Sequence, residues 1–120
     1  MTLAEAKKLC RAVGHSLQKT GYGDEYRYNY QNGSEATAGY TDDIEDAVGS
    51  SICTYLKDVG QDHIIHGLDL EGLIAWAKVN LLQPYLDWLR QPNGSLYMAP
   101  QGFNKAMATV HKFPPLPKVN

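Results

Sequence analysis

The sequence predicts an α+β fold, in which two helices back a three-stranded antiparallel sheet and a C-terminal helical extension follows. Three observations predict it. Residues 26–30 and 35–40 alternate with period two, as strands do, whereas residues 44–59 and 70–89 carry apolar residues at helical spacing. Glycine stands where each of the first two helices should end. With 120 residues and 43% hydrophobic content, the chain can bury one modest core.

A helix should begin at the start of this chain. Thr2 and Glu5 have the spacing of a capping box, in which a hydroxyl and a carboxylate satisfy free backbone N–H groups. Gly14 is a natural helix stop, so residues 15–20 are expected to form a short strand. Residues 21–24, Gly-Tyr-Gly-Asp, should then make a turn.

A tyrosine-rich hairpin should follow this turn. The alternating positions are Tyr26, Tyr28, Tyr30, Ala36, Ala38 and Tyr40. A loop made of the Asn-Gly pair alone would mix the two faces of the strands. We therefore expect a three-residue loop over 31–33, which sets Tyr28 opposite Ala36 and Tyr26 opposite Ala38.

The second helix should span residues 44–59. Thr41 or Asp42 is the expected cap, and acidic side chains in the first turn complement the positive end of the helix dipole. Gly60 should end the helix. One side is apolar and consists of Ile44, Ala47, Val48, Ile52, Tyr55, Leu56 and Val59.

The second half of the chain should be helical. Residues 1–60 form the predicted α-β-β-β-α unit, and residues 61–120 form a helical extension with a proline-rich tail that should pack on it as one domain. The connector over 61–68 leaves room for a turn of helix. Asp69 should cap a long helix over 70–89, which Pro84 should kink or divide. We also expect a turn over 91–95, a short helix over 104–112 and an extended tail over 113–120.

Two sides of the long helix are apolar, so several of its surfaces must be covered. Either the first unit or a second copy of the chain could cover them, which leaves a homodimer open. No apolar run approaches the roughly 18 residues that span a bilayer, so we expect no membrane contact. The two cysteines lie among apolar neighbours and suit a reducing compartment, which favours the cytoplasm.

Charge argues against binding of nucleic-acid duplexes. The chain has a net charge of −2 and no basic excess to neutralise phosphates. Double-stranded RNA-binding domains share the order helix, three strands, helix, but they grip phosphates mainly from a lysine-rich start of the last helix. Acidic residues occupy that position here and would repel a duplex.

Residues with catalytic or metal-binding chemistry are few. His63 and His66 would share a helical face near Asp62 or Asp69, but this spacing is common by chance and Asp69 already serves as a cap. No nucleophile elbow or glycine-rich phosphate loop occurs in the sequence. We therefore predict no catalytic residue, no metal ligand and no cofactor.

Two surfaces could bind a partner. The tyrosine face of the hairpin is most simply an inner face beneath the helices. If exposed, it would suit a protein hot spot or stacking on single-stranded nucleic acid. An acidic face could instead act as a decoy for a basic groove. The predicted partner-binding residues are Tyr26, Arg27, Tyr28, Tyr30, Glu35, Asp42, Asp43, Glu45 and Asp46.

A resemblance to known proteins lies in the stretch EYRYNYQNGSEATAGYTDDIEDAVG. It resembles short uncharacterised proteins of phages, prophages and proteobacteria that run from a strand hairpin through Tyr-Thr-Asp-Asp into a helix. The resemblance covers about residues 1–55 and carries no catalytic residue. It implies a mobile-element origin, in which small proteins bind and block host machinery, anti-CRISPR proteins being one such class.

The expected function is therefore that of a non-enzymatic phage protein that binds a host protein or protein complex and inhibits host defence. The first alternative is a single-stranded nucleic-acid-binding module that uses the tyrosine-rich hairpin. The second alternative is a small metal-dependent enzyme.

Overall fold

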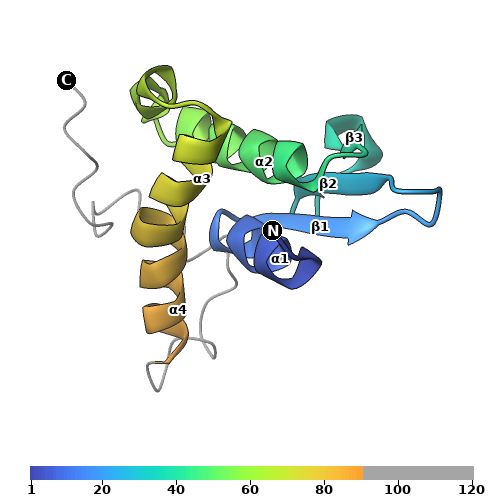
Figure 1. Cartoon of the computed structure of the whole chain (residues 1–120), viewed down its shortest axis with the longest axis horizontal. Helices are drawn as coiled ribbons and strands as arrows, with labels where there is room; N and C mark the ends of the chain where they lie inside the picture. The colour runs from blue at the N-terminus through green and yellow to red at the C-terminus, as the bar shows by residue number, and fades with distance from the viewer. Residues whose placement is uncertain (91–120) are drawn as a thin grey trace.

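A computed structural model describes residues 1–90 of the chain and has the expected α+β fold (Figure 1). The segments expected over 91–95, 104–112 and 113–120 lie outside the described residues. In chain order, the elements are α1 (Leu3–Ala12), β1 (His15–Lys19), β2 (Tyr26–Tyr30), the 3₁₀ turn η1 (Glu35–Thr37), β3 (Gly39–Thr41), α2 (Ile44–Asp58), the 3₁₀ turn η2 (Asp62–Gly67), α3 (Leu70–Ala77), the π turn η3 (Lys78–Leu82) and α4 (Gln83–Leu89).

The first helix begins and ends as its sequence predicts. The Glu5 backbone N–H donates to the Thr2 hydroxyl at 3.1 Å, and the Thr2 backbone N–H donates to the Glu5 carboxylate at 3.1 Å. This reciprocal pair is the predicted capping box. Gly14 has a φ of 75°, a left-handed conformation that glycine adopts without strain, and β1 begins at the next residue.

The sheet is antiparallel with strand order β1-β2-β3, but the predicted register of the second hairpin is wrong. Tyr28 pairs with Gly39 instead of Ala36, and Tyr26 pairs with Thr41 instead of Ala38. The connection between β2 and β3 is therefore not a three-residue loop. It spans residues 31–38 and contains the turn η1.

Two side chains of β2 explain this longer connection. Asn29 is 2% exposed, and its amide donates to the Ser34 carbonyl at 2.9 Å and accepts from the Thr37 hydroxyl at 2.6 Å. Tyr28 lies across Gly39 so closely that a Cβ atom there would meet Tyr28 Cζ at 2.2 Å. The ring therefore requires glycine opposite it, and the asparagine holds residues 34–37 in a turn.

The cap of α2 also differs from the prediction. Asp43, instead of Thr41 or Asp42, caps the helix: its carboxylate accepts from the backbone N–H groups of Glu45 at 3.0 Å and Asp46 at 3.4 Å. Thr41 acts one step earlier, because its hydroxyl accepts from the Asp43 backbone N–H at 3.1 Å. The carboxylate of Asp43 can reach the first turn because its own backbone is still extended.

The long C-terminal helix is continuous but not regular. Asp69 caps it as predicted and accepts from the Gly72 N–H at 2.8 Å. The irregularity expected at Pro84 lies one turn earlier, in η3, where the Gln83 N–H donates to the Lys78 carbonyl five residues back. Pro84 has no N–H to offer the preceding turn, which favours a wider turn at this point.

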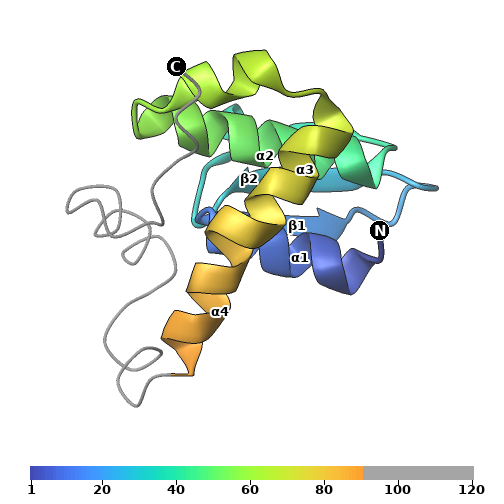
Figure 2. The ribbon, with the colours of Figure 1, turned by 60° about the vertical axis from the view of Figure 1, so that its left-hand side comes forward.

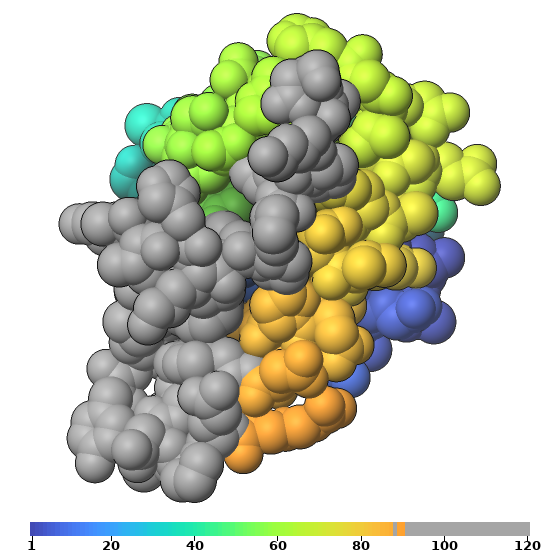
Figure 3. Space-filling view, turned by 90° about the vertical axis from the view of Figure 1, so that its left-hand side faces the viewer, coloured from blue at the N-terminus to red at the C-terminus, as the bar shows by residue number. Residues whose placement is uncertain are grey.

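The helices form a layer on one face of the sheet (Figure 1). In Figure 2, α3 and α4 form a single rod that runs diagonally across α1 and α2, which agrees with the contacts of α2 with α3 and of α1 with η3. Figure 3 shows this rod along the molecular surface with α1 beside it. One apolar core joins both parts of the described chain and includes Leu9, Leu17, Val48, Ile52, Leu56, Ile64, Ile74 and Leu81.

Candidate interaction surface

The three hairpin tyrosines belong to the helix-covered face of the sheet. Tyr26 and Tyr28 are half-buried and pack against the core. Tyr30 lies at the end of the same row, where its hydroxyl donates to Asp58 at 2.8 Å and its ring centroid lies 4.8 Å from that of His15. The placement of Tyr26 and Tyr28 therefore matches the inner-face interpretation, whereas Tyr30 at the end of the row is 38% exposed.

The opposite face of the sheet is polar and carries a compact charged cluster. Strand pairing sets Gln18 opposite Arg27, and Arg27 opposite Tyr40, in one row across the three strands. Arg27 Nη2 lies 3.2 Å from one carboxylate oxygen of Glu35, and the Tyr40 hydroxyl donates to the other. Gln18 and Tyr40 are exposed. We call Arg27, Glu35 and Tyr40, which bond to one another, the Arg27–Glu35–Tyr40 cluster.

The cluster has a fixed charge pattern near neutral pH. Hydrogen bonds from Tyr40 and Arg27 lower the pKa of Glu35, so its carboxylate stays ionised. The same carboxylate raises the pKa of Tyr40, so its hydroxyl keeps the proton that it donates. Arg27 is charged at neutral pH in any case, and hydrogen bonds to Tyr40 and Glu35 raise its pKa further.

Further acidic side chains follow β3 in the sequence, at the start of α2. The four predicted acids, Asp42, Asp43, Glu45 and Asp46, are all exposed. Within residues 1–90, Glu45 alone of these four has an ion-pair partner, the amino group of Met1 at 4.0 Å. Residues 1–90 contain 8 basic and 13 acidic side chains, which gives a formal net charge of −5. The surface is therefore anionic and mostly uncompensated.

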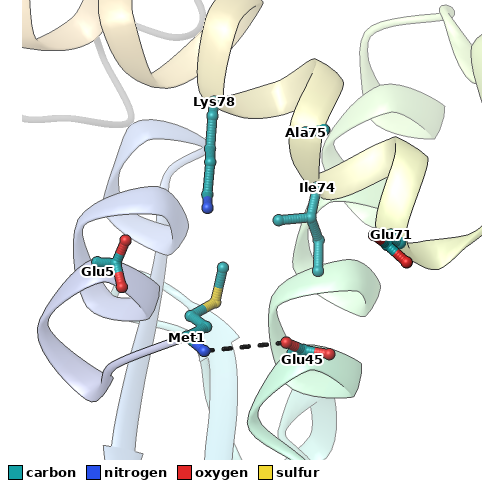
Figure 4. Close-up of a pocket in the computed structure, with 7 residues that line it drawn as sticks. All are labelled: Met1, Glu5, Glu45, Glu71, Ile74, Ala75 and Lys78. Carbon is teal, nitrogen blue, oxygen red and sulfur yellow. Dashed lines mark ion pairs between the residues drawn. The ribbon is translucent and has the colours of Figure 1, made fainter.

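A pocket of about 360 Å³ lies next to Glu45, between α1, α2 and α3 (Figure 4). Its lining residues are Met1, Glu5, Glu45, Glu71, Ile74, Ala75 and Lys78. Figure 4 shows Lys78 pointing into the space toward Met1, with Glu5 on one side and Ile74 on the other. Hydrogen bonds from Thr2 lower the pKa of Glu5, so this carboxylate is also ionised at neutral pH.

Groups with catalytic or metal-binding chemistry are not brought together in the described part of the chain. His63 and His66 are exposed in η2, and residues 1–90 contain no group of three His, Cys, Asp or Glu residues that could hold a metal ion. Cys10 is buried, and burial raises the pKa of its thiol to about 11, so it is a poor nucleophile. None of the described helices is both long and apolar enough to cross a membrane.

Comparison with known proteins found no matching family model, curated protein or solved structure.

The structure adds Tyr40, Glu71 and Lys78 to the predicted surface residues. Tyr40 stands opposite Arg27 only in the observed register. The alternation of residues 36–40 had instead placed it on the same face as the tyrosines of β2. Glu71 and Lys78 lie seven residues apart, the spacing of one helix face, but nothing local in the sequence indicates that α1 and α2 complete a pocket beside them.

Proposed function

We propose that this chain is a non-enzymatic interaction protein of phage or mobile-element type that binds a protein complex of its bacterial host. The binding surface is the acidic platform, defined as Arg27, Glu35, Tyr40, Asp42, Asp43, Glu45 and Asp46. The partner is a host defence complex with a basic groove, and binding inhibits that complex, as anti-CRISPR proteins do.

The observation that carries the proposal is the buried side chain of Asn29. It ties Ser34 and Thr37 of the loop over residues 31–38 to β2, so the backbone that carries Glu35 is held before any partner arrives. A preorganised surface loses less conformational entropy on binding than a floppy one. Compact surface loops of this length, packed by their own side chains, are frequently functional.

Electrostatics supports a basic protein groove as the target. The described part of the chain carries a net charge of −5, and complementary fields raise association rates and select against wrong partners. Tyrosine and arginine are the residues most often found at interface hot spots, and Tyr40 and Arg27 stand side by side here. An anionic protein seated in such a groove would exclude the nucleic acid that normally occupies it.

A tagged full-length chain tests the proposal by pull-down from host lysate. Asp42→Asn combined with Asp46→Asn removes two charges from the platform and leaves the Asp43 cap intact. Asp24→Asn combined with Asp62→Asn is the matched control, since both residues are exposed and lie outside the platform. We expect a recovered partner to be lost with the first pair and retained with the second. Equal recovery with both pairs would remove the platform from the proposal.

Two further measurements address the alternatives. Fluorescence anisotropy with a labelled single-stranded oligonucleotide tests the nucleic-acid reading, and saturable binding would replace the present proposal. Elemental analysis of the purified protein tests for a bound metal, which would favour the enzyme alternative. The homodimer stays a prediction that light scattering can measure.

A further inference from the structure

We propose that the pocket between α1, α2 and α3 receives an arginine side chain of the partner protein. The inference rests on the proposed function, because the pocket adjoins the acidic platform through Glu45. It specifies the chemistry that the partner must bring to this point.

The lining of the pocket suits a side chain with an apolar stem and a cationic head. Met1, Ile74 and Ala75 supply apolar wall for methylene groups, and two carboxylates come from different helices. Within residues 1–90 Glu71 has no ion-pair partner, whereas Glu45 lies 4.0 Å from the amino group of Met1. A guanidinium group has five N–H donors in a planar fork, so it can address carboxylates on more than one side. At about 360 Å³, the space is large enough for one such side chain.

The pocket already holds one positively charged side chain, that of Lys78. Its ammonium group points into the pocket, yet it makes no ion pair with any carboxylate in residues 1–90. Its charge does act on the lining, because it contributes to the lowered pKa of Glu5. Lys78 is exposed and its stem is flexible, so it can move to solvent and leave the carboxylates to an incoming guanidinium. The lining carries three carboxylates and two ammonium groups, those of Lys78 and Met1, so an anionic ligand would still meet a net negative charge.

The first test uses the full chain labelled with ¹⁵N and titrated with N-acetyl-arginine methylamide. The neutral citrulline analogue is the control ligand, because it keeps the shape and loses the charge. We expect saturable amide shifts around Glu45, Glu71 and Ile74 with the arginine compound only. Absence of saturable shifts, or equal shifts with citrulline, would overturn the inference.

Two substitutions then predict opposite changes in affinity for the arginine compound. Glu71→Gln should weaken binding about two- to fivefold, since an exposed ion pair is lost. Lys78→Gln should strengthen it by a similar factor, because a competing cation is removed. Asp62→Asn, which is exposed and lies beyond the far end of α2, should change nothing. Weaker binding by Lys78→Gln would contradict the inference, since loss of a cation weakens binding only where the site binds an anion.

The same variants separate the inference from the proposed function. If a host partner is captured and its affinity is unaltered by both Glu71→Gln and Lys78→Gln, the arginine pocket is wrong and the interaction function stands. If the arginine compound binds with the predicted signs and no partner responds to the platform variants, the pocket stands and the proposed function fails.

Discussion

The two faces of the sheet are made by the same three strands and differ in almost every physical respect. The face toward α1 and α2 carries Leu17, Tyr26 and Tyr28 and closes onto the core. The face away from them carries the row of Gln18, Arg27 and Tyr40, where exposed polar groups bond to one another. Because successive side chains of a strand point to opposite faces, the residues of the first face can contribute to stability while those of the second are free for recognition. With the exception of Asn29, which the loop over 31–38 buries, substitutions on one face should therefore leave the property of the other intact.

The largest expected effect lies beneath the covered face. Ile52 on α2 is 0% exposed, so Ile52→Ala removes buried methyl groups and leaves a cavity, at a cost of about 2–5 kcal/mol in the free energy of unfolding. Urea denaturation followed by circular dichroism measures it. Val79→Ala is the matched control, because Val79 is 68% exposed and should change little. Similar losses from both would mean that the core has been assigned to the wrong residues.

Asn29 gives the next largest effect, and it connects the two faces. Although it points away from the helices, it is 2% exposed because the loop over 31–38 covers it. Asn29→Ala leaves the Ser34 carbonyl and the Thr37 hydroxyl without this partner, which should cost about 1–3 kcal/mol. Hydrogen exchange should also accelerate in residues 31–38.

A neighbouring substitution serves as the control for Asn29. Asn32 has a φ of 65°, which glycine adopts freely, so Asn32→Gly should preserve both stability and exchange rates. If Asn29→Ala left the exchange rates of the loop unchanged, the loop would not be held by this side chain, and the preorganisation argument would fail.

The protonation of His15 on the covered face should make the stability of the protein depend on pH. Burial lowers the pKa of His15, and the Val13 carbonyl at 2.9 Å and Asp58 oppose this shift. Since the unfolded chain then binds the proton more readily, the contribution of His15 to stability is complete above its ordinary pKa of about 6.5 and is lost as pH falls through the folded value. The slope is at most about 1.4 kcal/mol per pH unit. Denaturation at pH 8 and pH 5 tests it, and His15→Gln should reduce the difference; an unchanged difference would exclude His15.

The smallest effect on stability belongs to the open face. Tyr40→Phe removes only the hydroxyl that donates to Glu35, and Tyr40 is exposed, so the midpoint of urea unfolding should not move. Partner recovery in a pull-down should fall, because the fixed arrangement of Glu35 and Arg27 is lost. A lower midpoint with unaltered recovery would reverse the roles that we assign to the two faces.

Local signals in the sequence predicted most of the fold. The capping box at Thr2, the glycine after α1 and the Asp69 cap each depend on residues within one turn, and each is confirmed. The register of β2 and β3 was not predictable in the same way. It depends on a buried Asn29 amide and on a Tyr28 ring that excludes a Cβ atom from Gly39, and both contacts join residues eight to eleven positions apart.

The candidate surface was predictable only in part. The acids at the start of α2 follow from the need to cap that helix, so the sequence identifies them directly. The sequence favoured burial of Tyr26 and Tyr28 on an inner face but left binding open as the alternative, since alternation alone does not tell which face the helices cover. The pocket depends on how α3 approaches α1 and α2, which no local pattern encodes.

The π turn η3 fixes the rotational phase of the last described helix. Leu73, Ala77, Leu81 and Tyr85 are all buried and are spaced by four residues, whereas a regular α-helix returns to the same side every 3.6. Over three such steps the side chains of an undistorted helix would rotate by about 120° away from the core. One wide turn absorbs much of this excess and keeps Tyr85 against Ala12 of α1. A single-residue insertion within residues 78–82 would thus add about a further 100° of rotation, swing the whole of α4 about its axis and unseat it, while leaving its amino-acid composition almost untouched.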